Sequence, residues 1–156
     1  MLEPGNLLPA FSLPDAQGNI HNSRDWRGTP LVLFCYPKAL TSACTAEACS
    51  LSASMNWFQK NSIHVVGLSI DEPTALARFT LRHKLNLLLL GDANHIAAEK
   101  LGVWGEKKLY GRTYMGLLRT TFLVDANGRI GSVVHKVNTK GHALQVQEAL
   151  RALGWY

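Results

Sequence analysis

The chain has few charged residues, few cysteines and no long apolar run. Charged residues make up 17% of its 156 residues, and cysteine occurs only three times. An apolar content of 47% with so little charge excludes a disordered chain, which combines low hydrophobicity with high net charge. Three cysteines are too few for a disulfide scaffold, and an odd number leaves at least one thiol free.

The longest apolar runs, Leu31–Tyr36 and Leu87–Leu90, fall far short of the roughly 20 residues that a membrane helix needs. The N-terminus lacks the basic and apolar segments of a secretory signal peptide. We therefore expect a cytoplasmic protein without membrane association. The chain length predicts one domain over residues 1–156.

A net charge of +5 raises the question of nucleic-acid binding. The basic residues occur in small groups, the densest within Arg78–Lys84 and Lys107–Arg112, with no basic block and no alternation with aromatic residues. A solvated surface accounts for this distribution, so we expect no nucleic-acid partner.

Hydrophobic periodicity and turn residues predict an alternation of strands and helices. The predicted elements are a hairpin over Phe11–Ile20, strands at Leu31–Tyr36, Ile63–Ile70 and Leu87–Leu90, a helix at Thr45–Gln59, a helix opening at Asp71, a helix at Ala93–Leu101 capped by Asp92 and ended by Gly102, a hairpin of Thr121–Val124 with Arg129–His135, and a final helix at His142–Leu153. This order predicts an α/β fold of the thioredoxin-like kind, a three-layer α/β/α sandwich with a central mixed sheet and an N-terminal hairpin extension. The C-x-x-C motif of thioredoxin itself is absent.

Cys44 lies where a predicted helix begins. Unpaired backbone N–H groups and the positive end of the helix dipole favour a thiolate there, and the thiolate is the nucleophilic form of cysteine. A small buried packing residue is the alternative, and position alone does not decide between the two. A helical projection places Cys44 at the head of the core-facing stripe of Ala48 and Leu51, with Cys49 about 140° away.

Cys44 and Cys49 cannot form a disulfide within an intact helix. Their Cα atoms would lie roughly 8.7 Å apart, beyond the ~7 Å limit for a disulfide, so pairing requires the first helical turns to unwind. A zinc site made of these cysteines and a distant histidine is an open alternative, for which C-x4-C is a weak indication. Cys35 lies inside an apolar strand and is expected to be a core residue.

The segment from 34 to 49 resembles the active-site signature of the peroxiredoxins, P-x-x-x-T-x-x-C, through Pro37, Thr41 and Cys44. It is most similar to the branch called bacterioferritin comigratory protein or peroxiredoxin Q, in which a second cysteine five residues later, here Cys49, is the resolving position. The similarity continues in residues 102–111 and 119–125. One departure is Ser42-Ala43, where the family often has Pro-Gly.

The resemblance implies a peroxidase that reduces hydrogen peroxide and organic hydroperoxides without metal, haem or flavin. Cys44 would become a sulfenic acid, Cys49 would condense with it to an intramolecular disulfide, and thioredoxin or a similar dithiol would reduce that disulfide. Thr41 would hydrogen-bond the thiolate and the peroxide. Arg119 would lie beside the sulfur and orient the peroxide, and Pro37 would shield the sulfur. Members of this branch are often monomeric, so we expect a monomer.

Other interpretations exist for each residue taken singly. Thr41 could be a helix cap, Arg119 a surface ion pair and Pro37 a strand terminator, but their joint occurrence with Cys44 favours the peroxidase. The alternative function is a thioredoxin-like redox-sensing or binding module, in which Cys44 is oxidised without significant turnover. Trp104 and Tyr110 are expected to pack near the site.

Overall fold

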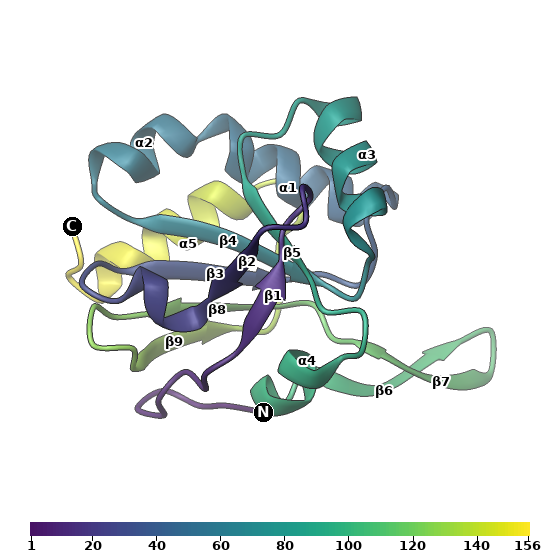
Figure 1. Cartoon of the computed structure of the whole chain (residues 1–156). Coiled ribbons are helices and arrows are strands. Elements are labelled where there is room, and N and C mark those ends of the chain that lie inside the picture. The colour runs from purple at the N-terminus through teal and green to yellow at the C-terminus, as the bar shows by residue number, and fades with distance from the viewer.

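A five-stranded mixed sheet forms the centre of the computed structural model, which describes all 156 residues (Figure 1). Its strands are β3 (Leu31–Cys35), β4 (His64–Ser69), β5 (Leu88–Gly91), β8 (Thr120–Val124) and β9 (Ile130–Val134). They lie in the order β5-β4-β3-β8-β9. The three strands β5, β4 and β3 are parallel, whereas β8 is antiparallel to both of its neighbours. The predicted mixed sheet is confirmed.

Helices and two small hairpins surround this sheet. The helices are α1 (Ser42–Ala53), α2 (Met55–Lys60), α3 (Pro73–His83), α4 (Ile96–Leu101) and α5 (His142–Ala152), with a 3-10 helix at Ser23–Trp26. The hairpins are β1 (Ser12–Pro14) with β2 (Ile20–Asn22), and β6 (Trp104–Leu109) with β7 (Arg112–Leu117). The first hairpin was expected from the sequence, and the second, which projects from the body in Figure 1, was not. No helix has the length and apolar character needed to cross a membrane.

Strand β3 divides the interior into two cores, because successive side chains of a strand point to opposite faces. Leu31, Leu33 and Cys35 belong to the core that α4 and the N-terminal segment cover. Val32 and Phe34 belong to the other core, to which α1, α2, α3 and α5 contribute. One core lies on each face of the sheet, between the sheet and the helices that cover that face. This confirms the predicted three-layer α/β/α arrangement.

The helix predicted at Thr45–Gln59 is two helices in the structure. Helix α1 begins three residues earlier than predicted and ends at Ser54, whose N–H donates to the Leu51 carbonyl at 3.1 Å and so closes a tighter turn. Helix α2 follows at once. The apolar stripe survives the interruption, since Leu51, Met55 and Phe58 are all buried.

The helix predicted at Ala93–Leu101 begins three residues later than expected. His95 has a left-handed backbone, with φ of 48°, and its ring stacks on Trp104 with ring centres 4.1 Å apart, so this part of the chain cannot be helical. Asp92 nevertheless serves the helix, because its Oδ2 accepts the N–H of Ala98 at 2.7 Å.

Tyr110 does not pack near the site, and that prediction was wrong. It is 97% exposed at the tip of the β6–β7 hairpin. The two-residue turn places positive φ on both Tyr110 and Gly111, 50° and 75°, which is the geometry that joins adjacent antiparallel strands most tightly. The turn therefore directs the tyrosine ring into solvent.

Candidate active site

Cys44 lies in the first turn of α1, immediately after the loop that leaves β3. Thr41 is the N-cap of this helix, so Cys44 is the third helical residue. The backbone N–H groups of the first turn have no acceptor within the helix, and they carry the positive end of its dipole. The Cys44 side chain is buried, with 1% of its surface exposed. Cys44 therefore lies in the core at the N-terminal end of α1.

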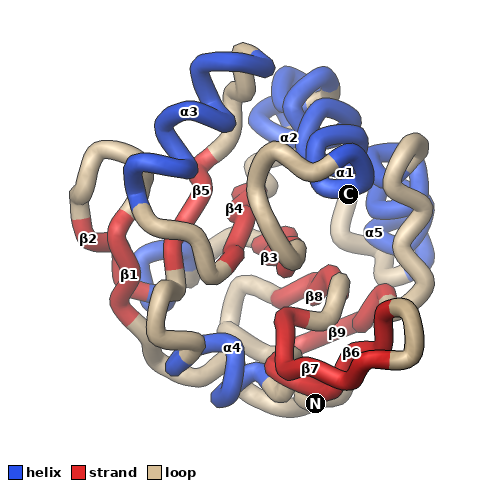
Figure 2. The backbone as a smooth tube through the Cα atoms, turned by 90° about the vertical axis from the view of Figure 1, so that its right-hand side faces the viewer, coloured by secondary structure: helices blue, strands red, loops and turns tan.

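The loop before α1 is fixed by Asp71. The Oδ2 atom of Asp71 accepts the N–H of Ala39 at 2.7 Å and the hydroxyl of Ser69 at 2.8 Å. Asp71 lies two residues after the end of β4, so the contact ties the loop to the carboxyl end of the neighbouring parallel strand. Figure 2 looks onto this end of the sheet, with α1 on one side and the β6–β7 hairpin on the other.

Arg119 lies between β7 and β8 and contacts the sulfur. Its Nη2 atom donates to Cys44 Sγ at 3.3 Å, and its Nη1 atom donates to Glu47 Oε1 at 2.6 Å. Burial opposes the charged guanidinium, but the charge of Cys44 and the bonds to Cys44 and Glu47 outweigh that cost, so the pKa of Arg119 is raised. The guanidinium therefore stays cationic where it meets the sulfur.

The other residues of the signature lie in the same loop and turn. Thr41 is exposed, and its hydroxyl donates to the Lys38 carbonyl at 2.8 Å. It makes no side-chain cap to the helix. Pro37 is half-buried at the start of the loop. Ser42 and Ala43 are the first two residues of α1 and have no positive φ, so the backbone does not require a glycine there.

All three cysteines are free thiols. Cys49 is half-buried in the same unbroken helix as Cys44, so the regular helical geometry that keeps their Cα atoms apart applies. Cys35 is fully buried in β3, and burial raises the pKa of its thiol, which confirms its prediction as a core residue. The structure contains no group of three His, Cys, Asp or Glu side chains that could hold a metal ion.

Comparison with known proteins identifies the family. Residues 4–133 match the family model described as the AhpC/TSA family. The chain is also 42% identical over 141 residues to the peroxiredoxin Bcp of Escherichia coli K12, covering 90% of each protein. The chain is a peroxiredoxin of the AhpC/TSA family. A putative peroxiredoxin of Haemophilus influenzae is 41% identical to this peroxiredoxin over 97% of the chain and 98% of the relative.

Solved structures confirm the predicted fold and the branch of the family. The peroxidoxin BcpB of Mycobacterium tuberculosis superposes with a TM-score of 0.85 at 30% identity, covering 97% of this chain and 98% of that chain. The PrxQ of Xylella fastidiosa superposes with a TM-score of 0.92 at 25% identity, covering 99% and 98%. The peroxiredoxin is thus a thiol-dependent peroxidase with a thioredoxin-like fold, and a module without turnover is not favoured.

Two residues that the sequence interpretation missed lie close to Arg119 in this peroxiredoxin. Glu47 is fully buried, and its burial raises the pKa of the carboxyl to about 7, although the bond and the charge of Arg119 oppose the shift. The sequence could have indicated Glu47, because a residue three positions after Cys44 lies on the same face of the helix as Cys44.

Lys107 of β6 is the second missed residue. It is half-buried rather than part of the solvated basic surface that the sequence predicted, and its Nζ donates to the Leu117 carbonyl at 3.1 Å. Burial lowers the pKa of Lys107, the charge of Arg119 lowers it further, and the charge of Cys44 opposes both. The sulfur therefore lies in the field of two cations.

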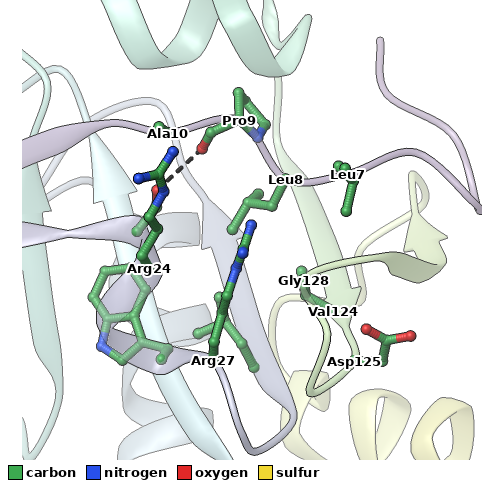
Figure 3. Close-up of a pocket in the computed structure, with 12 residues that line it drawn as sticks. Leu7, Leu8, Pro9, Ala10, Arg24, Arg27, Val124, Asp125 and Gly128 are labelled. Carbon is green, nitrogen blue, oxygen red and sulfur yellow. Dashed lines mark hydrogen bonds between the residues drawn. The ribbon is translucent and has the colours of Figure 1, made fainter.

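A separate hollow of about 280 Å³ lies at the opposite end of β3 (Figure 3). Leu31, the first residue of β3, forms part of its wall. Figure 3 shows Arg24 and Arg27 on one side of it, with Asp125 and Gly128 on the other. None of the predicted site residues lines this hollow, so it is distinct from the cysteine site.

Proposed function

We propose that this peroxiredoxin reduces alkyl hydroperoxides and hydrogen peroxide through Cys44, with Cys49 and a thioredoxin-like dithiol completing the cycle. The observation that carries the proposal is the bond of 3.3 Å from Arg119 Nη2 to Cys44 Sγ in the first turn of α1. A cation and a helix N-terminus together favour the reactive thiolate. The substrate class is supported by the Xanthomonas campestris bacterioferritin comigratory protein, described for alkyl peroxide reduction, which is 29% identical to this chain.

In the first step, the Cys44 thiolate attacks the terminal oxygen of the hydroperoxide. An S–O bond forms, the O–O bond breaks, and the departing alkoxide takes a proton from water and leaves as the alcohol. Cys44 is thereby oxidised to the sulfenic acid. Arg119 Nη2 and the free N–H groups of α1 donate to the peroxide oxygens as negative charge moves onto them.

Thr41 and Pro37 complete this site. The hydroxyl hydrogen of Thr41 is donated to the Lys38 carbonyl, so Thr41 does not donate to the thiolate as the sequence led us to expect. Its oxygen keeps a lone pair, which accepts the O–H of the hydroperoxide. We assign Pro37, which is half-buried at the start of the same loop, to shielding the sulfur from water and other thiols.

In the second step, the Cys49 thiolate attacks the sulfur of the sulfenic acid. The S–S bond forms, the hydroxyl group leaves as water after protonation, and an external dithiol then reduces the disulfide by exchange. Both cysteines lie on one helix, so one chain acting as a monomer and a single domain is sufficient. Free thiols that cycle with a dithiol suit a reducing cytoplasm and need no bound cofactor.

The proposal is tested by peroxide consumption with thioredoxin, its reductase and tert-butyl hydroperoxide. Cys44→Ser should abolish turnover, whereas Cys35→Ala, which changes a buried thiol outside the site, should retain it. Turnover that persists in Cys44→Ser would overturn the assignment of the nucleophile.

The role of Arg119 is testable at the first step alone. Removing one donor from a site that stabilises developing charge costs on the order of 100-fold in rate, so Arg119→Ala should slow sulfenic acid formation by about that factor. Arg119→Lys should be intermediate, because lysine keeps the charge but cannot bond Cys44 and Glu47 in the same fork. Stopped-flow tryptophan fluorescence measures the rate. An Arg119→Ala rate equal to that of the wild type, in a folded protein, would contradict the role.

A further inference from the structure

A chain of buried polar groups extends from the active site to the C-terminal helix. Glu47 accepts Arg119 with Oε1, and its Oε2 lies 3.5 Å from Nε2 of His142, the first residue of α5. His142 is fully buried and lies 2.8 Å from two further groups, the Thr121 hydroxyl at Nε2 and Gln145 Oε1 at Nδ1. Arg119 is therefore connected through Glu47 to a histidine on a different element.

The position of one histidine proton follows from Gln145. Its amide nitrogen donates to the Lys136 carbonyl at 2.9 Å, and its Oε1 accepts the N–H of Asn138 at 2.9 Å, which fixes the orientation of the amide. Because Oε1 is an acceptor, the Nδ1 atom of His142 must carry a hydrogen. In the neutral ring, Nε2 is then an acceptor, and the Thr121 hydroxyl donates to it.

This arrangement leaves Glu47 Oε2 without a donor. The atom is buried and has no hydrogen-bond partner. The group nearest to it, His142 Nε2, presents a lone pair when the ring is neutral. An ionised carboxylate facing a lone pair in the core is costly, and one additional proton, on Glu47 Oε2 or on His142 Nε2, removes the conflict.

We propose that His142 is a positioning residue for the peroxidase reaction: it retains one proton between Nε2 and Glu47 Oε2, and so leaves the positive charge of Arg119 available to Cys44. This inference rests on the proposed function of Cys44. When the pair holds the proton, Glu47 and His142 together carry no net negative charge beside Arg119. When the proton is lost, the Glu47 carboxylate competes with the Cys44 thiolate for the guanidinium.

Several titratable groups besides His142 lie around Glu47 or around its partner Arg119. They are Cys44 on α1, Cys35 and Tyr36 at the end of β3, Lys107 on β6 and Arg119 before β8. Burial raises the pKa values of Cys35 and Tyr36, so both stay neutral, and Arg119 stays charged. The remaining titratable groups beside Arg119 and Cys44 are therefore the Glu47–His142 pair and Lys107.

The test is the pH dependence of Cys44 alkylation by iodoacetamide, in full-length protein carrying Cys35→Ala and Cys49→Ser. In His142→Gln, the amide can accept from Thr121 and donate to Glu47 Oε2, which favours the ionised carboxylate. The alkylation midpoint should then move by about one unit to higher pH, equal to a tenfold change in the equilibrium between thiol and thiolate. Thr121→Val leaves Nε2 free to bind the pair's proton more tightly, and the midpoint should move to lower pH.

Opposite shifts of the alkylation midpoint in His142→Gln and Thr121→Val distinguish a positioning role from simple destabilisation. Destabilisation would lower the melting temperature of both variants without moving the midpoint. His64→Gln, which changes an exposed histidine on β4, should leave the midpoint unchanged. Two results would overturn the inference. One is an alkylation midpoint in His142→Gln equal to that of the parent protein. The other is a midpoint that moves in Lys107→Gln but in neither His142→Gln nor Thr121→Val. Alkylation needs no peroxide, so failure of the proposed function would be seen separately as absent peroxide consumption.

Discussion

Glu47 places a carboxyl group in the core, where ionisation costs free energy. Its pKa is raised from 4.5 to about 7, because burial outweighs the opposing ion pair with Arg119. The folded state therefore holds this proton more tightly than the unfolded state. Above about pH 7, ionisation of Glu47 lowers the free energy of unfolding by its full amount, roughly 3 to 4 kcal/mol at 1.4 kcal/mol per pKa unit.

This burial predicts a specific pH dependence of stability. A raised carboxyl pKa means that the contribution of Glu47 to the free energy of unfolding falls as pH rises from about 4.5 to 7. Relative to the wild type, Glu47→Gln should therefore become progressively more stable across this window. Urea unfolding at pH 5, 6, 7 and 8 measures the difference between the two proteins.

A matched control for Glu47→Gln is Glu148→Gln, because Glu148 lies on the exposed face of α5. Its difference from the wild type should stay flat over the same range. The buried His142 contributes with the opposite sign, since its lowered pKa makes stability rise with pH up to about 6.5. For this reason, the informative quantity is the difference in free energy of unfolding between Glu47→Gln and the wild type, and not the wild-type curve alone. A flat difference for Glu47→Gln would contradict a buried carboxyl with a raised pKa.

At the scale of elements, the proposed cycle requires α1 to carry a nucleophile in its first turn and to come apart after oxidation. Cys44 and Cys49 are separated by more than one helical turn, so their bond excludes an intact helix over these residues. The same turns hold Glu47 against Arg119, so that contact must also open when the disulfide forms. In the proposed cycle, oxidation therefore dismantles the site until a dithiol restores it.

The unwinding of α1 predicts a loss of helix on oxidation. One equivalent of hydrogen peroxide should lower the far-ultraviolet circular dichroism signal of the wild type, and a dithiol should restore it. Cys49→Ser should form the sulfenic acid and keep its helix, because no disulfide can form. A wild-type spectrum that does not change, although both thiols have been consumed, would contradict unwinding.

Most elements could be predicted from the sequence, because buried strands such as Leu31–Tyr36 are continuous apolar runs and because Leu51, Met55 and Phe58 recur at helical spacing across α1 and α2. The β6–β7 hairpin was missed since its strands carry Glu106, Lys107 and Lys108 and bury little apolar surface. The break at Ser54 and the late start of α4 depend on local backbone turns, which hydrophobic periodicity does not report.

At the scale of the whole molecule, the site joins parts of the chain that lie far apart in sequence. Cys44 and Arg119 are separated by 75 residues, and the histidine of the buried network lies on the last helix. Position at a helix start left Cys44 open between nucleophile and packing residue, and family resemblance indicated its role and that of Arg119. Glu47 and His142 could not be paired from the sequence, because neither residue shows which element it will face after folding.

The whole cycle is assigned to one chain, and this assignment predicts where the disulfide forms. Both cysteines belong to α1, and Cys35 is sealed between β4 and β8 with a raised thiol pKa. Oxidation should therefore consume two of the three thiols and leave the chain monomeric.

Peptide mapping after one equivalent of tert-butyl hydroperoxide tests this most directly. The account predicts a single linkage, between Cys44 and Cys49 of the same chain, with Cys35 recovered as a free thiol and no covalent dimer under non-reducing conditions. A linkage that includes Cys35, a linkage between chains, or peroxide consumption with Cys44 recovered unmodified would contradict it.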